Sequence, residues 1–306
     1  AIEQTISRTV VLKDICAGCA GCVLVCPYGC LEYFDEKPNL IKKCEACGIC
    51  PRVCPRLDLS QPALEKMVFQ REHKPDEESG INRRLVIARA SRENILRVCQ
   101  DGGVVSALLV HALNNGIIDS AIVSATSKEK PLFPTPQLVS TPEEILECAG
   151  TRYTYSPNIP SFQEGTKQNK KNLAFVGTPC QVTAVRKMQA SNLDAETNRI
   201  KLIIGLFCTW AFSPEVCGFI KDTVGGARLL KLDVPPPPAN IFVIQIEGKR
   251  FEVPLNEVRK FIMPSCNVCF DMTNEGADVS VGTVEGEENW NTVIVRTKEG
   301  KKILQR

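Results

Sequence analysis

The sequence predicts an α/β protein in two parts, a small cysteine-rich α+β domain followed by a larger mixed α/β domain. Three observations support this fold class. Half of the 16 cysteines fall into two runs of the same spacing before residue 58. From residue 83 onward, strand-length apolar runs alternate with helix signals. With 306 residues and 43% hydrophobic content, the chain is long enough to bury two cores.

The two cysteine runs share the spacing C-x2-C-x2-C-x3-C-P. The first contains Cys16, Cys19, Cys22 and Cys26-Pro27, and the second contains Cys44, Cys47, Cys50 and Cys54-Pro55. This doubled run is the pattern of bacterial two-cluster ferredoxins, in which the fourth cysteine of each run ligates the other run's cluster. The spacing therefore predicts one [4Fe-4S] cluster on Cys16, Cys19, Cys22 and Cys54, and a second on Cys44, Cys47, Cys50 and Cys26. Residues 1–58 would form this two-cluster ferredoxin domain, with a short strand at 39–41.

Structural zinc and disulfides are the alternatives for these cysteines. A zinc site needs four thiolates per metal and usually pairs two C-x2-C knuckles across a longer gap. Disulfides are disfavoured because three thiols within seven residues cannot satisfy bridge geometry among themselves. Soft thiolate ligands match iron, so the spacing favours clusters that carry one electron at a time.

The composition excludes several other function classes. The net charge of +2 gives no basic face for nucleic acid. No apolar stretch approaches the roughly 20 residues that span a bilayer. The only two histidines, His73 and His111, give poor support to a histidine-based acid–base mechanism. Because 16 cysteines occur without any secretory signal, we expect a cytoplasmic protein whose thiols bind metal.

The remaining chain is a connector, residues 59–82, and the larger domain, residues 83–306. The charge run at 71–80 of the connector is typical of a solvated surface segment, and we assign it no chemistry. Strands are predicted at 85–88, 121–123, 173–176, 201–208 and 277–281. Helices are predicted at 91–99, at 104–113 and after Thr141, Pro179 and Ser213, with a hairpin turn at 247–249. The chain ends in what reads as the second arm of another hairpin.

Four cysteines of the larger domain could form a third metal site. Cys180 and Cys208 each end or follow a predicted strand, and Cys266 and Cys269 form a C-x2-C pair. Spacing alone leaves open the alternative that they are core residues, because single buried cysteines are common. The cysteines left over, which we read as small buried apolar side chains, are Cys30, Cys99, Cys148 and Cys217.

Five segments of the larger domain carry a family resemblance. They are QDGGVVSALLVHALNNGIIDSAIV (100–123), GTRYTYSPN (150–158), GTPCQVTAVRKMQ (177–189), CNVCFDMTNEGADVSVGTV (266–284) and WNTVIVRT (290–297). In this order they resemble the family of the beta subunits of coenzyme F420-reducing hydrogenases, from about residue 83 to the C-terminus. The resemblance implies that Cys180, Cys208, Cys266 and Cys269 hold a third [4Fe-4S] cluster close to a bound FAD. The ferredoxin extension is lacking in the hydrogenase subunit and is similar to that of a membrane-complex input subunit that oxidises reduced coenzyme F420.

The flavin site implied by the resemblance has no Rossmann fingerprint, because the chain contains no G-x-G-x-x-G. Asp101-Gly102-Gly103 precede an apolar helix, where backbone N–H groups could receive a pyrophosphate. The other candidates are small or hydroxyl-bearing residues, several at strand ends, where α/β sheets usually bind ligands. Taken singly, each of these motifs could be an ordinary turn. The predicted flavin-binding residues are Asp101, Gly102, Gly103, Ser106, Gly150, Thr151, Tyr153, Ser156, Asn158, Gly177, Thr178 and Pro179.

Basic residues could bind the acidic tail of the deazaflavin through charge-assisted hydrogen bonds. The candidates are Lys167, Lys170, Lys171, Arg186 and Lys187. Those at 167–171 read as a solvated helix face. Arg186, next to the segment that bears Cys180, is the predicted ligand-binding residue.

The cysteine pattern and the resemblance together predict a flavo-iron–sulfur oxidoreductase subunit. It would oxidise reduced coenzyme F420 by hydride transfer to FAD and pass single electrons through three [4Fe-4S] clusters to a partner protein. The partner would be a subunit of a larger redox complex, with peripheral association at a membrane compatible with this role. Two alternatives stay open: a ferredoxin-dependent reductase similar to 7-hydroxymethyl chlorophyll reductase, and a flavin-free electron-transfer subunit.

Overall fold

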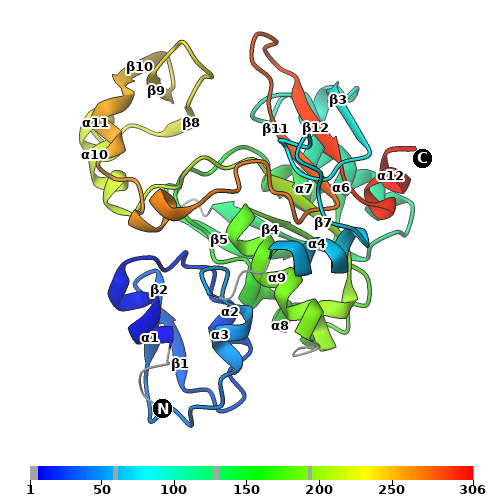
Figure 1. Ribbon diagram of the computed structural model, residues 1–306. Helices are drawn as coiled ribbons and strands as arrows, with labels where there is room; N and C mark the ends of the chain where they lie inside the picture. The colour runs from blue at the N-terminus through cyan, green and yellow to red at the C-terminus, as the bar shows by residue number, and fades with distance from the viewer. Residues whose placement is uncertain (1–5, 58–60, 127–130, 192–194, 306) are drawn as a thin grey trace.

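The computed structural model of the chain describes residues 6–57, 61–126, 131–191 and 195–305. It contains a two-stranded, a three-stranded and a seven-stranded sheet. In Figure 1 the N-terminal unit lies below the three-stranded sheet, and both lie to one side of the seven-stranded sheet. The protein is thus a mixed α/β structure organised around one large sheet.

The N-terminal unit, residues 6–57, is small and is built around its cysteine loops. Its two strands pair antiparallel, with Leu31 opposite Leu40. One buried core cluster lies within it and consists of Ile6, Val10, Cys22 and Cys54, so thiols supply half of this cluster. Its elements are α1 (Ile6–Thr9), η2 (Val11–Lys13), α2 (Gly21–Leu24), β1 (Leu31–Phe34), β2 (Lys37–Leu40) and α3 (Ile49–Val53).

The seven-stranded sheet has the order β3-β12-β11-β7-β6-β4-β5. The central strands β4, β6, β7 and β11 run parallel, whereas β5 and β12 run antiparallel to their neighbours. The carboxyl ends of the parallel strands therefore meet at one edge, where α/β sheets usually bind ligands. The strands are β3 (Arg84–Ala88), β4 (Ser120–Thr126), β5 (Pro134–Val139), β6 (Leu173–Gly177), β7 (Ile200–Leu206), β11 (Val279–Thr283) and β12 (Asn291–Val295).

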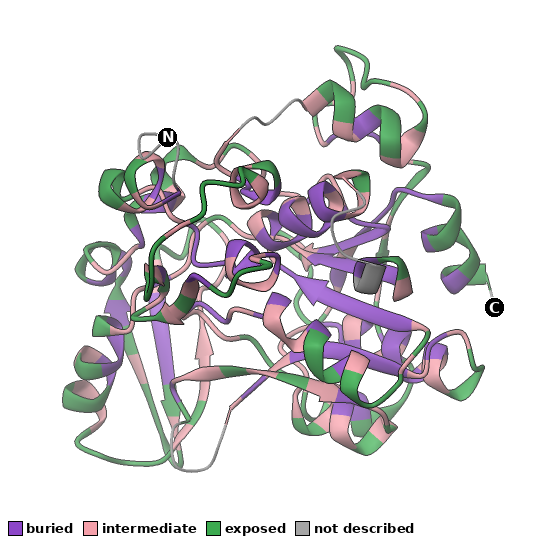
Figure 2. Cartoon of the chain, turned by 90° about the horizontal axis from the view of Figure 1, so that it is seen from below, coloured by how far each residue is buried: buried purple, intermediate pink, exposed green. Residues whose placement is uncertain are grey.

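Helices cover both faces of this sheet, which explains why every residue of β6 is buried. One core lies between the sheet and α6, α7 and α12, and a second lies between the sheet and α8 and α9. In Figure 2 the strands of the large sheet are mostly buried. The elements are α5 (Glu93–Leu96), α6 (Val104–Asn114), α7 (Pro142–Glu147), η3 (Ile159–Ser161), α8 (Phe162–Lys167), α9 (Pro179–Ser191), η4 (Ala195–Arg199) and α12 (Lys298–Gln305).

The N-terminal unit packs on the outer side of α9. Cys19, Val25 and Val53 belong to the same core as the buried face of α9. A Cβ atom at Gly21 would lie 2.8 Å from Cε of Met188 and 3.6 Å from Cβ of Ala184, so α2 packs closely on α9. This contact fixes the first cysteine run against the large sheet.

A third core belongs to the three-stranded sheet, which has the order β10-β9-β8. Phe212 and Phe242 lie at its centre, with ring centroids 5.6 Å apart in an edge-on arrangement. This subdomain leads back to the large sheet through the segment that bears Cys266 and Cys269. Its elements are α10 (Glu215–Val224), β8 (Leu229–Asp233), β9 (Ile241–Ile246), β10 (Lys249–Pro254), α11 (Leu255–Arg259) and η5 (Pro264–Val268).

The connector is more structured than expected. It contains the helix α4 (Gln61–Phe69), which contacts α9. The carboxylate of Glu65 is only 3% exposed and lies 2.8 Å from Nδ1 of His73. Most of the charge run at 71–80 is exposed, as predicted, but Gly80 is buried against Glu275. The connector is therefore docked on the larger domain.

Two further expectations need correction. The predicted helix at 91–99 is limited to α5, four residues long. The chain does not end in a hairpin arm, because β12 is followed by α12, whose Ile303 is buried on the large sheet. Across the described ranges, no helix combines the length and the apolar character needed to cross a bilayer.

Candidate electron-transfer site

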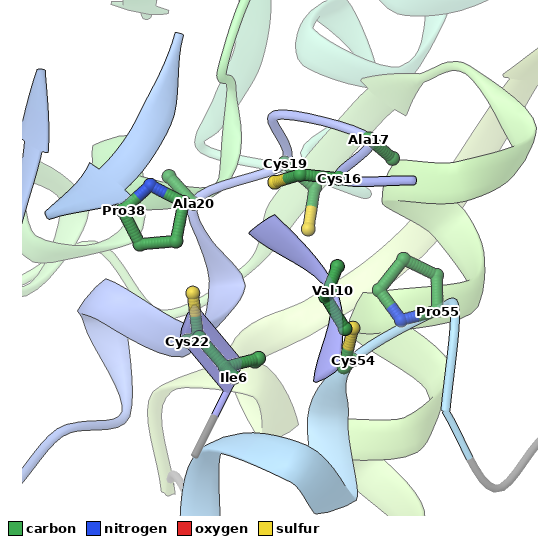
Figure 3. Close-up of a pocket in the computed structure, with 10 residues that line it drawn as sticks. All are labelled: Ile6, Val10, Cys16, Ala17, Cys19, Ala20, Cys22, Pro38, Cys54 and Pro55. Atoms are coloured by element: carbon green, nitrogen blue, oxygen red, sulfur yellow. The ribbon is translucent and has the colours of Figure 1, made fainter. Parts of the chain in front are cut away.

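The four cysteines predicted to hold the first cluster surround one pocket. Cys16, Cys19 and Cys22 come from the loop before α2 and its first turn, and Cys54 follows α3. Figure 3 shows the sulfurs of Cys16, Cys22 and Cys54 directed into the same space. The rest of the lining is apolar or backbone: Ile6, Val10, Ala17, Ala20, Pro38 and Pro55. A hollow lined by four thiols and little else polar fits a group that takes sulfur ligands at several corners.

The two cysteine loops repeat the same backbone conformation 28 positions apart. Gly18 and Ala46 have φ angles of 68° and 51°, and Ala20 and Gly48 have φ angles of 58° and 73°. Left-handed residues turn the chain sharply, at a cost for alanine that glycine avoids. In both loops the N–H of the first such residue donates to a sulfur, Gly18 to Cys16 at 3.5 Å and Ala46 to Cys44 at 3.4 Å.

The second predicted set of cysteines is also brought together. Burial raises the pKa of Cys50 to about 11, and the neighbouring thiols of Cys44, Cys47 and Cys26 contribute to the rise. Cys26 accepts a hydrogen bond from the Cys30 N–H at 3.3 Å. Cys47 is exposed, so this set lies at the surface of the N-terminal unit.

The third set is assembled at the carboxyl edge of the large sheet. Cys180 lies in the first turn of α9, directly after β6, and Cys208 follows β7. Burial raises the pKa of Cys208, and the thiols of Cys180, Cys266 and Cys269 raise it further. The chain thus brings together four thiols from three segments that are far apart in sequence.

Hydrogen bonds hold these three segments in place. The Cys208 N–H donates to the carbonyl of Met272 at 2.9 Å, and the Ala211 N–H donates to the Cys266 sulfur at 3.4 Å. The fully buried Asn274 donates from Nδ2 to the carbonyls of Gly177 and Leu206, at 2.9 and 3.1 Å. Asn274 therefore ties the segment bearing Cys266 and Cys269 to the ends of β6 and β7.

A second pocket lies at the junction between the N-terminal unit and the third set. It contains Cys180 and Cys269 together with Arg56 from the N-terminal unit. The Arg56 Nη2 donates to the Ser265 carbonyl at 2.9 Å. The other lining residues are Pro55, Gln61, Pro179, Thr183, Phe270 and Asp271.

Tyr155 and Lys187 complete this junction. The Tyr155 hydroxyl lies 3.8 Å from the Cys180 sulfur, and a Cβ atom at Gly18 would lie 3.2 Å from the Tyr155 ring. The buried Lys187 donates from Nζ to the carbonyls of Cys54, at 2.7 Å, and of Leu57. Sequence reasoning missed Arg56 and Tyr155. The sequence marks them only by their positions: Arg56 directly follows Cys54-Pro55, and Tyr155 lies within the 150–158 segment.

No three His, Cys, Asp or Glu side chains among the described residues are grouped so as to hold a single metal ion. The thiols of the first set line a pocket instead of meeting at a point. Elsewhere Cys30 and Cys217 are buried, as predicted, whereas Cys99 and Cys148 are partly exposed.

The predicted flavin residues before α6 lie beside the carboxyl end of β3. A Cβ atom at Gly102 would lie 2.8 Å from the Ala88 carbonyl, and one at Gly103 would lie 2.9 Å from Ile95. Packing between loop, strand and helix therefore already requires these glycines. The Asn291 side chain accepts from the Val104 N–H at 3.2 Å, and Ser106 is buried in the first turn of α6.

Asp101 and Tyr153 lie near each other beside the three-stranded sheet. Burial raises the pKa of Asp101, and Asp233 raises it further. Burial likewise raises the pKa of Tyr153, whose hydroxyl accepts from the Val234 N–H at 2.9 Å. Nearby Gly150 has a φ of 94° and Thr151 is exposed. These residues form a partly buried polar group beside the N-terminus of α6.

The other predicted flavin residues are occupied by protein contacts. Ser156 donates to Oδ1 of Asn158 at 2.8 Å, and Asn158 donates to the Val176 carbonyl at 3.0 Å. A Cβ atom at Gly177 would lie 2.6 Å from the Phe175 ring. Thr178 lies 3.3 Å from the Cys180 sulfur, and Pro179 lines the second pocket. These five residues position the loops at the end of β6, and the last two border the third thiol set.

The structure does not support the assignment of Arg186 to a ligand. Its guanidinium donates to Gly276 at 2.8 Å, to Asp278 at 2.9 Å and to Gln189 at 3.0 Å. The Arg186–Asp278 pair is largely buried, with exposures of 12% and 8%. Arg186 therefore anchors the segment before β11 to α9.

Comparisons with known proteins cover most of the chain. Family models described as the N-terminal and C-terminal parts of the coenzyme F420 hydrogenase/dehydrogenase beta subunit match residues 85–163 and 170–306. The chain is similar to the beta subunit of the coenzyme F420 hydrogenase of Methanosarcina barkeri, with 34% identity over 71% of this chain and 76% of that protein. It is also similar to a subunit of the F(420)H(2) dehydrogenase of Methanosarcina mazei, with 29% identity over 96% of this chain and 83% of that protein.

The structure resembles a chain of the solved F420-reducing [NiFe] hydrogenase complex from Methanosarcina barkeri. The TM-score is 0.71 at 33% identity, covering 76% of this chain and 81% of that chain. A match over 96% of this chain, as with the dehydrogenase subunit, must include most of the cysteine-rich N-terminal unit. Because the family models together span most of the chain from residue 85 onward, the protein belongs to the family of coenzyme F420 hydrogenase/dehydrogenase beta subunits.

Proposed function

We propose that this protein is an F420-dependent oxidoreductase subunit that oxidises reduced coenzyme F420 by hydride transfer to FAD. Electrons would then pass singly through three [4Fe-4S] clusters to a partner protein. The observation that carries the proposal is the continuous series of the three thiol sets. The family assignment favours this function over a ferredoxin-dependent pigment reductase.

The thiols themselves suggest the order of the clusters. Besides burial, the neighbouring thiols that raise the pKa of Cys22 include Cys50, which belongs to the second set. Those that raise the pKa of Cys16 and Cys19 include Cys180, which belongs to the third set. Pro55 also lines both the pocket of the first set and the pocket that contains Cys180 and Cys269. We therefore infer that the first set lies between the third set, at the large sheet, and the second set, at the surface. Electrons that enter at the large sheet would leave through the cluster of Cys26, Cys44, Cys47 and Cys50.

The thiol sets suit iron because of their donor chemistry. Burial raises the pKa of Cys50 and Cys54 to about 11, so both thiols are neutral near pH 7 without a bound cation. Iron ionises a coordinating thiol outright, and soft sulfur matches it. Backbone N–H donors to the sulfurs of Cys16, Cys44 and Cys266 are the kind of contact that sets cluster potentials.

For the flavin, we propose the polar group of Asp101 and Tyr153 beside the N-terminus of α6. FAD would supply the conversion between a two-electron hydride donor and one-electron clusters. The residues of the chain would hold it: the α6 N-terminus favours anionic groups, and Gly150 and the exposed Thr151 add little bulk nearby.

We further propose that residues 1–58 act as a two-cluster ferredoxin domain, 59–82 as a docked linker and 83–306 as the flavin and third-cluster domain. The partner would be another subunit of a redox complex in the cytoplasm, since a reducing compartment keeps 16 cysteines available for iron. The solved structure that this chain resembles is that of such a complex, an F420-reducing hydrogenase.

Anaerobic stopped-flow mixing with reduced coenzyme F420 tests the proposal, with NADH as the control donor. With reduced coenzyme F420 we expect the flavin absorbance to bleach first and the cluster absorbance to fall afterwards. With NADH we expect neither change. In Cys208→Ala, which lacks one ligand of the third set, bleaching should persist while reduction of the other clusters slows. Absence of bleaching with reduced coenzyme F420 would rule out the proposed substrate.

The iron content tests the number of clusters independently of substrate. Three four-iron clusters require about 12 irons per chain, and Cys208→Ala should contain about 8. A content of about 8 in the unaltered protein would contradict the third cluster while leaving the first two.

A further inference from the structure

Arg56 crosses the boundary between the N-terminal unit and the large domain. It follows Cys54 by two positions, yet its Nη2 donates to the carbonyl of Ser265, at 2.9 Å, directly before Cys266. The same side chain lines the second pocket with Cys180 and Cys269. One residue of the cysteine-rich unit is therefore built into the wall of the third thiol set.

One N–H donor of the Arg56 guanidinium has no acceptor within the described ranges. Its Nε is buried and has no hydrogen-bond partner among the described residues. A buried donor without an acceptor is costly, and more so on a charged group. The orphaned donor lies on a side chain that lines the sulfur-bearing pocket, so an anionic group held by Cys180 and Cys269 would satisfy it.

The charged side chains of this pocket leave Arg56 free to face an anionic group. Of the nine residues that line it, Arg56 is the one cation and Asp271 is the one carboxylate. Asp271 is already engaged, because it accepts hydrogen bonds from the N–H groups of Asn274, at 2.7 Å, and Glu275.

A cluster held by four thiolates carries net negative charge, which grows by one when the cluster is reduced. A fixed cation nearby stabilises the reduced state more than the oxidised state, and the effect is larger where water is excluded. An arginine suits this position better than lysine, because its planar guanidinium can bond to a carbonyl and to sulfur at the same time.

We propose that Arg56 is a positioning residue of the third cluster, which raises its reduction potential from across the domain boundary. The inference rests on the proposed third cluster and goes beyond it, because it gives the N-terminal unit a second task. Besides receiving electrons, the unit adjusts the centre that delivers them. The potential of the third cluster is thus adjusted only when the N-terminal unit is docked on the large domain.

An anaerobic redox titration of the complete cluster-loaded protein, followed by electron paramagnetic resonance, tests this inference. The signal of the third cluster is the one that disappears in Cys208→Ala. In Arg56→Gln we expect its midpoint potential to fall, by about tenfold in the one-electron reduction equilibrium, or about 59 mV. Arg56→Lys, which keeps the charge, should stay nearer the unaltered protein.

Arg52→Gln is the matched control, because Arg52 is an exposed arginine on α3 in the same unit. Its substitution should leave the third potential unchanged. If the signal is present but Arg56→Gln does not shift it, or if Arg56→Lys shifts it equally, the inference is wrong and the proposed function stands. If the unaltered protein has no third-cluster signal, the third cluster and the inference fall together.

Discussion

Lys187 illustrates how a single buried charge can hold two parts of the molecule together. It projects from α9 and is 7% exposed, and its ammonium group donates to the carbonyls of Cys54 and Leu57. These carbonyls belong to the segment that carries the last ligand of the first thiol set. The lysine therefore positions Cys54, a proposed cluster ligand, through its backbone carbonyl.

Replacing Lys187 by Met keeps the volume but removes the donor from two carbonyls in a buried setting. We expect the free energy of unfolding to fall by about 1–3 kcal/mol, the usual cost of leaving a buried polar group unsatisfied. Anaerobic chemical denaturation of the cluster-loaded protein measures the change. Lys167→Met, on the exposed side of α8, is the control and should have no measurable effect. Equal midpoints for the two variants would show that Lys187 does not hold the junction.

At the scale of single residues, sequence reasoning reaches as far as the information is local. The first two thiol sets follow from spacing within runs of a few residues, and the structure brings the members of each set together. Arg56 and Ser265 are separated by 209 positions, and no local sequence pattern near either residue predicts their contact. The third set needed a family resemblance for the same reason, because its members lie at the ends of distant strands.

Two glycines within helices differ in how closely other atoms pack against them. A Cβ atom at Gly300 of α12 would lie 2.1 Å from the backbone oxygen of Asp278, whereas one at Gly218 of α10 would meet nothing within 4 Å. The first glycine lets α12 lie against the segment before β11. The second is an exposed helix position with no packing reason to lack a side chain.

Alanine at these two positions should therefore act in opposite directions. Gly218→Ala should raise the free energy of unfolding by about 0.5–1 kcal/mol through helix propensity. Gly300→Ala should lower it by about 1–3 kcal/mol, because α12 must move away from backbone. Thermal unfolding of both variants under identical anaerobic conditions gives the comparison. A destabilised Gly218→Ala would contradict the open space around that position.

At the scale of elements, the buried runs of the central strands gave reliable predictions. The strands at 85–88, 121–123, 173–176, 201–208 and 277–281 correspond to β3, β4, β6, β7 and β11, with shifted ends. The sequence of β5 contains two prolines and no clean alternation, so nothing marked it as a strand. The helices α4 and α12 were missed because their short, highly charged sequences resemble solvated segments until a partner surface is known.

At the scale of the whole molecule, the three thiol sets extend from the carboxyl edge of the large sheet to the surface. The third set lies at the sheet, the first at the domain junction, and the second around the exposed Cys47. The proposed partner would therefore dock near the loop at 44–50. This arrangement would separate the proposed site of hydride chemistry from the proposed site of electron delivery.

This separation predicts a selective defect in Cys47→Ala. We expect the loss of about four irons per chain, unchanged flavin bleaching by reduced coenzyme F420, and loss of electron transfer to an external one-electron acceptor. Cys30→Ala is the matched control, because the Cys30 thiol is buried nearby and donates to the Lys43 carbonyl at 3.3 Å. Cys30→Ala should keep all its iron and its transfer rate. Unimpaired electron transfer by Cys47→Ala would show that electrons leave the protein at another site.

Apart from the residues packed on α9, the core cluster of the N-terminal unit consists of two aliphatic side chains and two thiols, Ile6, Val10, Cys22 and Cys54. Because this cluster is small, the proposed metal clusters would supply much of the unit's stability, and metal insertion and folding would be coupled. A copy synthesised during iron shortage would leave the ribosome with this unit unfolded and open to proteases, while the large sheet could still form. The lifetime of each newly made molecule would then depend on the nutritional state of the cell.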